Sequence, residues 1–192
     1  MTRASPSTKL RIHITGASGS GVSTLGAALA HRLGAEHLDT DAFYWRRTDP
    51  PFTRSRPIQE RLAMLEAAFG AAADGWVLSG SLDGWGDPLI PEFQRVIFLV
   101  APTELRLARL AARERQRYGA AIDEGGEAHA HHLDFLAYAA AYDTGQFAGP
   151  MTGRYRARHE VWLARLSCPV VRLDGAIAAE ALVEAVLASG GF

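Results

Sequence analysis

Residues 16–24 read GASGSGVST, a glycine-rich sequence that indicates the fold class of the chain. It matches the phosphate-binding pattern Gly-x-x-x-x-Gly-Lys-Ser/Thr at Gly16, Gly21 and Ser23, and it has Val22 where the pattern has lysine. Glycines permit the positive φ angles and the close backbone approach with which such a loop surrounds an anion. The prediction is a nucleotide whose phosphates rest on backbone N–H groups of the loop. The residues expected to contact it are Gly16, Ala17, Ser18, Gly19, Ser20, Gly21, Val22, Ser23 and Thr24.

The segments on either side of the loop favour the same interpretation. Residues 10–14 (LRIHI) form a short run with β-branched residues, which is typical of a buried strand. Residues 23–33 (STLGAALAHRL) repeat leucine at helical spacing. The order strand, glycine loop, helix places a helix N-terminus, with its partial positive charge, at the phosphates. An ordinary Gly/Ser-rich turn between a strand and a helix is the alternative.

The cation that the loop lacks at Val22 must come from another segment. Lys9 is the only lysine of the chain, and it precedes the first predicted strand, at the end of that strand far from the loop. Any substitute is therefore an arginine, whose planar head binds phosphate in a bidentate manner. Arg154, Arg156 and Arg158 are candidates. We expect weaker or slower phosphoryl transfer with nucleotide binding retained, because the backbone cradle survives.

Composition predicts one soluble globular domain, residues 9–192, after a disordered leader at 1–8, since 48% of the 192 residues are apolar and 21% are charged. A formal net charge of −1 gives no attraction to nucleic acid or to an anionic membrane, and no apolar run approaches the ~20 residues of a spanning helix. Cys168 is the only cysteine, which fits a cytoplasmic protein, and we interpret it as a packed small residue. We expect a monomer or homodimer that binds a nucleotide and a small-molecule substrate.

Strand-like and helix-like segments alternate along the chain, which predicts an α/β fold with a parallel sheet. The predicted strands are 10–14, 37–39, 76–78, 96–100 and 170–173. The predicted helices are 23–33, 58–69, one that begins at 103, 129–142, 154–166 and a C-terminal helix. Right-handed crossovers would join them in three layers, a five-stranded parallel sheet flanked by helices. Ligands bind such a sheet beyond the carboxyl ends of its strands, and the glycine loop follows the first of them.

Two carboxylates, Asp39 and Asp41, follow the second predicted strand in the sequence LDTD. At a spacing of i, i+2 in extended chain they face the same way. Asp39 would then bind Mg²⁺ and substrate together with Ser23, while Asp41 orients or deprotonates an acceptor hydroxyl as a general base. The alternative is that such an aspartate caps the next helix.

Arginines gather in two segments that suit anions. Arg54 and Arg56, on a proline-stiffened loop, suit an anionic acceptor, with a solvated surface as the alternative. Arg109 and Arg113 share a helical face after the strand VIFLV, and their helix leads into a polar, glycine-containing stretch. We expect them to be catalytic arginines of a lid at about 113–155 that neutralises charge on the transferred group. Surface ion pairs are the alternative.

The loop after the third predicted strand reads SGSLDGWGD. Its Gly80 lets a substrate approach the backbone, and its Trp85 could stack on a substrate ring. A tight loop with a half-buried tryptophan is the alternative. His129, His131 and His132 invite a metal interpretation, but no cysteine or close carboxylate completes a ligand set, so we favour a surface histidine cluster.

With these motifs in place, the chain resembles the adenylate kinase-like group of P-loop nucleoside, nucleotide and small-metabolite kinases over nearly its whole length. The resemblance rests on GASGSGVST, LDTD, the glycine loop after the third strand, VIFLVAP followed by RLARLAARERQR, and VRLDG. It implies the strand order 2-3-1-4-5, an ATP lid after the arginine helix, and an adenine bordered by the loop at Asp174. LDTD is also similar to the Asp-x-Asp of shikimate kinases, which handles the acceptor hydroxyl and Mg²⁺.

Two departures from the family matter. Val22 replaces the lysine that grips phosphate, and Ser79-Gly80-Ser81 stands where adenylate kinases carry Asp-Gly-Phe-Pro-Arg, which argues against AMP as the acceptor. We therefore expect a phosphotransferase that uses ATP and Mg²⁺ on a small metabolite or nucleotide. A nucleotide-binding regulator with weak or lost catalysis, and a slow NTPase, stay open as alternatives. The acceptor-side carboxylates and lid arginines favour the enzyme, because a passive binder would not need them.

Overall fold

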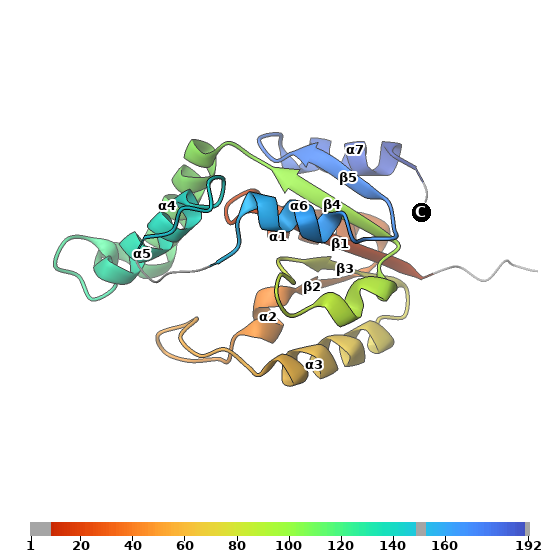
Figure 1. Cartoon of the computed structure of the whole chain (residues 1–192), viewed down its shortest axis with the longest axis horizontal. Coiled ribbons are helices and arrows are strands. Elements are labelled where there is room, and N and C mark those ends of the chain that lie inside the picture. The colour runs from red at the N-terminus through yellow and green to blue at the C-terminus, as the bar shows by residue number, and fades with distance from the viewer. Residues whose placement is uncertain (1–8, 149–152, 191–192) are drawn as a thin grey trace, which may run out of the picture.

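The computed structural model of the chain describes residues 9–148 and 153–190. Five strands form one parallel sheet in the order β2–β3–β1–β4–β5, as the resemblance implies (Figure 1). The strands are β1 (Leu10–Gly16), β2 (Glu36–Asp39), β3 (Gly75–Ser79), β4 (Arg95–Val100) and β5 (Val170–Asp174). Each predicted strand is confirmed, with small differences at its ends. The leader predicted at 1–8 lies outside the described residues.

Helices cover both faces of the sheet, because the strands alternate buried side chains between the two faces. In β4, Ile97 and Leu99 belong to a core shared with α1 and α7, whereas Val96 and Phe98 belong to a core shared with α3 and α6. The helices are α1 (Val22–Leu33), α2 (Thr40–Tyr44), α3 (Ile58–Ala71), α4 (Thr103–Tyr118), α5 (His129–Ala140), α6 (Arg156–Leu163) and α7 (Ala179–Ala188), with 3₁₀ turns η1 (Asp87–Glu92) and η2 (Gly119–Ile122). The three-layer α/β prediction is confirmed. Within the described ranges, no helix has the length and apolar character needed to cross a bilayer.

The carboxyl ends of the strands carry the elements that frame the site. Figure 1 shows α4 and α5 extending together away from the sheet at this end, and α2 following β2. The short helix α2 was not expected from the sequence. It forms because the Asp39 carboxylate accepts a hydrogen bond from the Asp41 backbone N–H at 2.9 Å, which caps the first turn. Asp39 therefore caps α2 through Oδ1, while its other oxygen, Oδ2, accepts a hydrogen bond from Ser23 and leaves the predicted metal role open.

Arg106 anchors α4 at the end of the sheet. Its side chain is fully buried, with Nη2 donating to the Asp143 carboxylate at 2.8 Å and Nη1 donating to the Ala139 carbonyl at 3.0 Å. Asp143 also binds Arg156, so one carboxylate ties α4 to the start of α6. Removing one partner from a buried ion pair costs several kcal/mol of folding free energy, about 3–5 kcal/mol. This cluster therefore holds the first turns of α4, the helix that carries the predicted lid arginines, in place against the sheet.

Two histidines are buried on the α6 face of the sheet. His13, in β1, donates from Nδ1 to the Leu78 carbonyl at 3.0 Å, and its ring stacks on Phe93. Nδ1 of His159, in α6, lies 2.8 Å from the Tyr142 hydroxyl. Burial lowers the pKa of His13 to about 4 and the pKa of His159 to about 3. Both rings are therefore neutral in the folded protein at pH 7.

We predict that the protein loses stability between pH 7 and pH 5. The unfolded chain binds a proton at His13 near pH 6.5, whereas the folded protein does so only near pH 4, so lowering the pH through this window favours unfolding. The expected loss from His13 alone is about 2 kcal/mol. Denaturant unfolding of wild type and His13→Leu at both pH values measures it. The variant should lose about that much of the pH dependence, and equal pH dependence in both proteins would contradict the prediction.

Candidate functional site

A cavity of about 870 Å³ lies between the glycine loop, α2, α4 and α5, at the carboxyl ends of β1, β2 and β3. The glycine loop lines it with residues from Gly16 to Thr24. We call its second wall the acceptor side, formed by residues between Asp39 and Phe52 and by the loop 80–85. We call its third wall the lid side, formed by α4, α5 and Arg154. Predicted residues from separate segments thus meet around one space.

The glycine loop curls as the sequence predicts. Gly19 and Gly21 have φ angles of +81° and +98°, and a Cβ on Gly16 would lie 2.6 Å from a backbone carbonyl oxygen of β4. Gly21 is the N-cap of α1 and makes no side-chain cap, so the first-turn N–H groups are available to an anion. Ser20 differs from its prediction: it does not line the cavity, and its N–H donates to the Ala17 carbonyl at 3.1 Å within the loop. The remaining geometry fits the phosphate groups of a nucleotide.

Arg109 joins the lid side to the glycine loop. Its Nη1 donates to the Gly175 carbonyl at 2.8 Å and to the Gly19 carbonyl at 3.5 Å. The turn after β5 packs directly on the loop, since a Cβ on Gly175 would lie 2.4 Å from the Ser20 carbonyl oxygen. Arg109 therefore sits where three segments meet, at the edge of the predicted phosphate site.

Ser23 and Asp39 form the candidate metal pair. Ser23 Oγ donates to Asp39 Oδ2 at 2.7 Å, and both residues line the cavity. Mg²⁺ takes oxygen ligands and usually binds through one or two carboxylates together with substrate phosphates and water. Within residues 9–148 and 153–190, no group of three or more His, Cys, Asp or Glu residues could hold a metal by itself. The pair therefore fits Mg²⁺ that arrives with a nucleotide, and it does not form a closed metal site.

Asp39→Asn should reduce the gain in ATP affinity that Mg²⁺ provides, by about tenfold. Asparagine keeps the size of the side chain and its capping oxygen but removes the charge that attracts the cation. Calorimetric titrations with ATP in Mg²⁺ and in a chelator give this ratio. Glu92→Gln, a charge change near the opposite end of β1 beside Arg11, is the control. An unchanged ratio in Asp39→Asn would show that Asp39 does not hold the metal.

Asp41 lies in the first turn of α2, and not in extended chain as expected, yet it still lines the cavity with Asp39. The Asp41 side chain is in contact with solvent inside the cavity, and the cavity walls lie around it. Desolvation and the charge of Asp39 raise the pKa of Asp41 above its usual value, and the opposing charges of Arg154 and Arg113 limit the rise. A carboxylate with a raised pKa beside two cations suits a group that accepts a proton from a hydroxyl.

Arg154 reaches the glycine loop from the lid side. Its Nη2 donates to Ser18 Oγ at 3.2 Å, and its Nε and backbone N–H donate to the Tyr138 hydroxyl at 3.4 and 3.3 Å. Its charge also acts on Asp41 across the cavity. An arginine positioned between the loop and the acceptor-side carboxylate can supply the positive charge that Val22 lacks.

The other cations considered for this role are engaged elsewhere. Arg156 is paired with Asp143, and Arg158 is paired with Asp83. Lys9 lies before β1, at the opposite end of the sheet, as expected. Of Arg154, Arg156 and Arg158, Arg154 is therefore the one that the fold brings to the loop, which Arg109 also contacts.

Arg54 and Arg56 do not line the cavity, contrary to the expectation of an anion-binding pair. Arg54 is exposed, and Arg56 Nη1 donates to the carbonyls of Ala42 at 3.0 Å and Phe43 at 3.2 Å. Arg56 also pairs with Glu60 at 3.2 Å. Its guanidinium satisfies the last carbonyls of α2, which have no partner within so short a helix.

Gly80 and Trp85 line the acceptor side, together with three aromatic residues that the sequence analysis did not single out, Tyr44, Trp45 and Phe52. Gly80 has a φ of +115°, and a Cβ there would lie 1.9 Å from a hydroxyl of α2. Trp85 lines the cavity but is only 7% exposed, so little of its surface meets the cavity. The aromatic density of FYW after LDTD was the signal that could have pointed to this wall.

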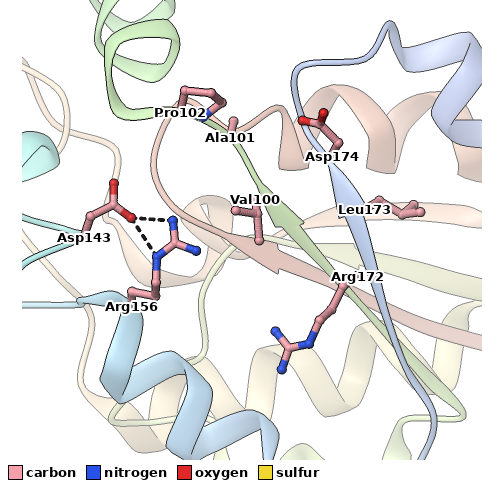
Figure 2. Close-up of a pocket in the computed structure, with 8 residues that line it drawn as sticks. All are labelled: Val100, Ala101, Pro102, Asp143, Arg156, Arg172, Leu173 and Asp174. Carbon is pink, nitrogen blue, oxygen red and sulfur yellow. Dashed lines mark hydrogen bonds and ion pairs between the residues drawn. The ribbon is translucent and has the colours of Figure 1, made fainter.

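Asp174 lines a different, smaller cavity of about 430 Å³ at the ends of β4 and β5 (Figure 2). The Asp143–Arg156 ion pair forms one wall of it, and Arg172 extends on the other, where it pairs with a carboxylate of α6. The Asp174 carboxylate accepts a hydrogen bond from the Ala176 N–H at 2.9 Å, which shapes the turn after β5. A contact of Asp174 with adenine stays a prediction.

The three histidines occupy different surroundings. His131 lines the large cavity, His132 is buried, and His129 Nδ1 donates to the Ile122 carbonyl at 2.9 Å. The expected surface cluster is therefore not what the fold forms, because η2 packs against the start of α5. The metal interpretation gains nothing, since the described residues contain no metal-binding group of these types.

Comparison with known proteins places this geometry in a family. A family model described as "AAA domain" matches residues 12–130, which include the glycine loop and α4 of the lid side. The Bacillus subtilis (strain 168) protein named "Uncharacterized protein YqaC" is 46% identical over 179 residues, which cover 93% of this chain and 96% of that protein.

Solved structures agree on the fold. Shikimate kinase from Bacteroides thetaiotaomicron is similar with a TM-score of 0.56 and 16% identity, covering 94% of this chain and 97% of that chain. Shikimate kinase from Acinetobacter baumannii, solved with shikimate, is similar with a TM-score of 0.54 and 18% identity, covering 94% and 92%. At such identities the likeness shows the fold alone. The chain therefore belongs to the P-loop family that the AAA domain model describes, with the fold of the adenylate kinase-like kinases.

Proposed function

We propose that this protein transfers the γ-phosphoryl group of Mg²⁺–ATP to a hydroxyl group of a small molecule. The observation that carries the proposal is the shared cavity, which the curled glycine loop, the Ser23–Asp39 pair, Asp41 and the lid arginines all line. A protein that only binds nucleotide would need the loop and the metal pair, but not the second carboxylate, Asp41, that lines the same cavity. The fold neighbours named shikimate kinases support a reaction of this class.

The residues divide the work of in-line transfer. The loop N–H groups hold the phosphates, and Asp41 orients the acceptor hydroxyl and accepts its proton. Arg113 and Arg154, whose charges both act on Asp41, neutralise negative charge on the group in transfer. Ser23 and Asp39 would hold Mg²⁺, which would supply positive charge to the phosphates.

Arg154 takes the place of the loop lysine in this proposal. A loop lysine offers a compact point charge from within the loop, whereas Arg154 offers a planar, bidentate head from the opposite wall. Its hydrogen bond to Ser18 Oγ supports this, since it brings the guanidinium to the rim of the loop. Phosphoryl transfer would then depend on how closely the lid side approaches the loop.

The test is a coupled assay of ADP release by the full chain with Mg²⁺–ATP and a panel of nucleosides, nucleotides, sugars and sugar acids. The expected result is turnover above basal hydrolysis with at least one class of acceptor. ATP binding without any acceptor-dependent turnover would overturn the proposal and favour a regulator, the alternative to which Val22 points. Phosphate release stimulated only by a macromolecule would favour the slow NTPase.

A further inference from the structure

The acceptor side of the cavity is an aromatic wall, formed by Tyr44, Trp45, Phe52 and Trp85. Ring centroids lie 4.7 Å apart for Tyr44 and Trp45, 6.2 Å for Tyr44 and Trp85, and 6.0 Å for Trp45 and Phe52. These spacings are those of aromatic residues in direct contact. The four rings are therefore one continuous surface beside the predicted acceptor position.

The backbone presents Phe52 to the cavity. The loop between α2 and α3 folds back on itself, with the Arg46 N–H donating to the Arg54 carbonyl at 2.8 Å and the Arg56 N–H donating to the Tyr44 carbonyl at 2.8 Å. Phe52 has a φ of +63°, which non-glycine residues rarely adopt.

Phe52 also contacts the opposite wall. The Arg117 guanidinium of α4 lies 4.8 Å from the centre of the Phe52 ring, a cation–π contact between lid side and acceptor side. Phe52 is thus in contact with α4 as well as with the other rings of its own wall.

The charges around this wall are unsuited to an anionic acceptor. The acceptor side lines the cavity with the carboxylates Asp41 and Asp83, of which Asp83 is paired with Arg158, and no arginine or lysine lines the cavity among the described residues of this side. Arg54 and Arg56 lie outside the cavity. Arg61 does not line the cavity, and its guanidinium packs on Tyr44, 3.7 Å from the centre of that ring.

The cations lie on the other wall. Arg109, Arg113, Arg117 and Arg154 line the lid side, where the transferred phosphoryl group would be. A phosphate or carboxylate on the acceptor, placed against the aromatic wall, would face Asp41 without a bidentate partner of its own. Apart from Arg117, which contacts Phe52, the cations that line the cavity thus lie away from the aromatic wall, and this favours a neutral ring against that wall.

We propose that the acceptor is an uncharged compound with a flat or apolar ring face and a free hydroxyl. This inference rests on the proposed function and names its substrate class. The ring stacks on the aromatic wall, and the hydroxyl points to Asp41. The hydroxyl oxygen forms a bond to the γ-phosphorus as the bond to the bridging oxygen of ADP breaks, and the hydroxyl proton passes to the Asp41 carboxylate. Nucleosides and cyclic sugars share this chemistry.

Binding of matched pairs to the full chain, saturated with Mg²⁺–ADP so that the nucleotide site is filled, tests the inference. One pair is a nucleoside and its 5′-monophosphate, and the other is a pyranose and the corresponding uronic acid. Quenching of intrinsic tryptophan fluorescence reports binding, because Trp45 and Trp85 line the cavity. The expected result is at least tenfold tighter binding of the neutral member in one pair, and which pair responds identifies nucleoside or sugar. Equal or tighter binding of the anionic members, or no binding of either neutral one, overturns the inference.

Variants separate the wall from the nucleotide site. Phe52→Leu keeps an apolar side chain but removes the ring, and it should weaken binding of the neutral acceptor about tenfold with Mg²⁺–ADP affinity unchanged. Trp85→Leu should also weaken binding of the neutral acceptor. Because Trp85 is buried, this second variant can lose folding, whereas Phe52 is half-exposed and its replacement should leave the fold intact. Arg47→Ala, exposed in the same loop, is the control that changes neither affinity. Unchanged acceptor binding in Phe52→Leu overturns the inference.

Measuring Mg²⁺–ADP binding and acceptor preference on the same protein distinguishes failure of this inference from failure of the proposed function. Absence of Mg²⁺–ADP binding in the wild-type chain would contradict the proposed function itself. Normal Mg²⁺–ADP binding with preference for an anionic acceptor would contradict the neutral-ring inference alone.

Discussion

Arg154→Ala lowers the affinity for Mg²⁺–ATP by about 10- to 100-fold, because it removes a charge-assisted contact to phosphate worth about 1.5–3 kcal/mol. Arg154 is placed for that contact, since its Nη2 lies 3.2 Å from Ser18 Oγ and its charge acts on Asp41. Calorimetric titration measures the change. Arg165→Ala is the matched control, because that guanidinium pairs with Asp87 and neither residue lines either cavity. The control should leave the affinity unchanged.

Adding Val22→Lys to the Arg154→Ala variant tests whether Arg154 contributes to Mg²⁺–ATP affinity through its positive charge. A lysine at this position begins α1 and completes the phosphate-binding pattern, so it should recover at least about tenfold of the lost affinity. In the wild-type background the same change should gain less, since one cation already serves the site and the two effects are coupled. Normal affinity in Arg154→Ala, or no recovery in the double variant, would show that Arg154 is not the substitute for the lysine.

The fold was predictable because its signals are local and periodic. The run VIFLV reads as a strand buried on both faces, and in β4 its residues divide between the two cores. Helical spacing of leucines identified α1 in the same way. The glycine loop was predictable for a stronger reason. Gly19 and Gly21 take positive φ angles that few other residues allow, so glycine at these positions indicates the backbone conformation directly.

Side-chain roles that depend on distant partners were not predictable. Arg106 and Arg109 both belong to the arginine-rich face of one helix, but Arg106 is buried on Asp143, 37 residues away, while Arg109 lines the cavity. Nothing in the helix itself distinguishes the two. Arg154 was likewise one of three equivalent arginines until the fold placed Asp143 and Asp83 beside the other two.

The acceptor side was least predictable, because its shape depends on α2. This helix has five residues, too few to show helical periodicity, and it begins at a cap that LDTD permits but does not require. Once α2 forms, its carbonyls draw Arg56 away from the cavity, and Tyr44 and Trp45 come to line it. One short element thus replaces an expected anion-binding wall with an aromatic one.

Asp41→Asn should reduce acceptor-dependent turnover by about 10²- to 10⁴-fold, the range expected for the loss of a general base. Asparagine keeps the size of the side chain but cannot take the hydroxyl proton, so Mg²⁺–ATP affinity should change little. Asp83→Asn is the matched control, since Asp83 also lines the cavity but is held by Arg158 at 2.8 Å. A comparable loss in both variants would indicate a general effect of negative charge and contradict the assignment of Asp41 as the base.

The pH profile separates a base from a positioning group. A base works when deprotonated, so kcat/KM should fall as the pH drops through the pKa of Asp41, which desolvation and Asp39 raise above its usual value. The residual activity of Asp41→Asn should lack that fall. Because protonation of His13 in the unfolded chain also destabilises the fold below about pH 6.5, rates must be normalised to the folded fraction measured at each pH. A fall that persists in Asp41→Asn after this correction would place the titrating group elsewhere.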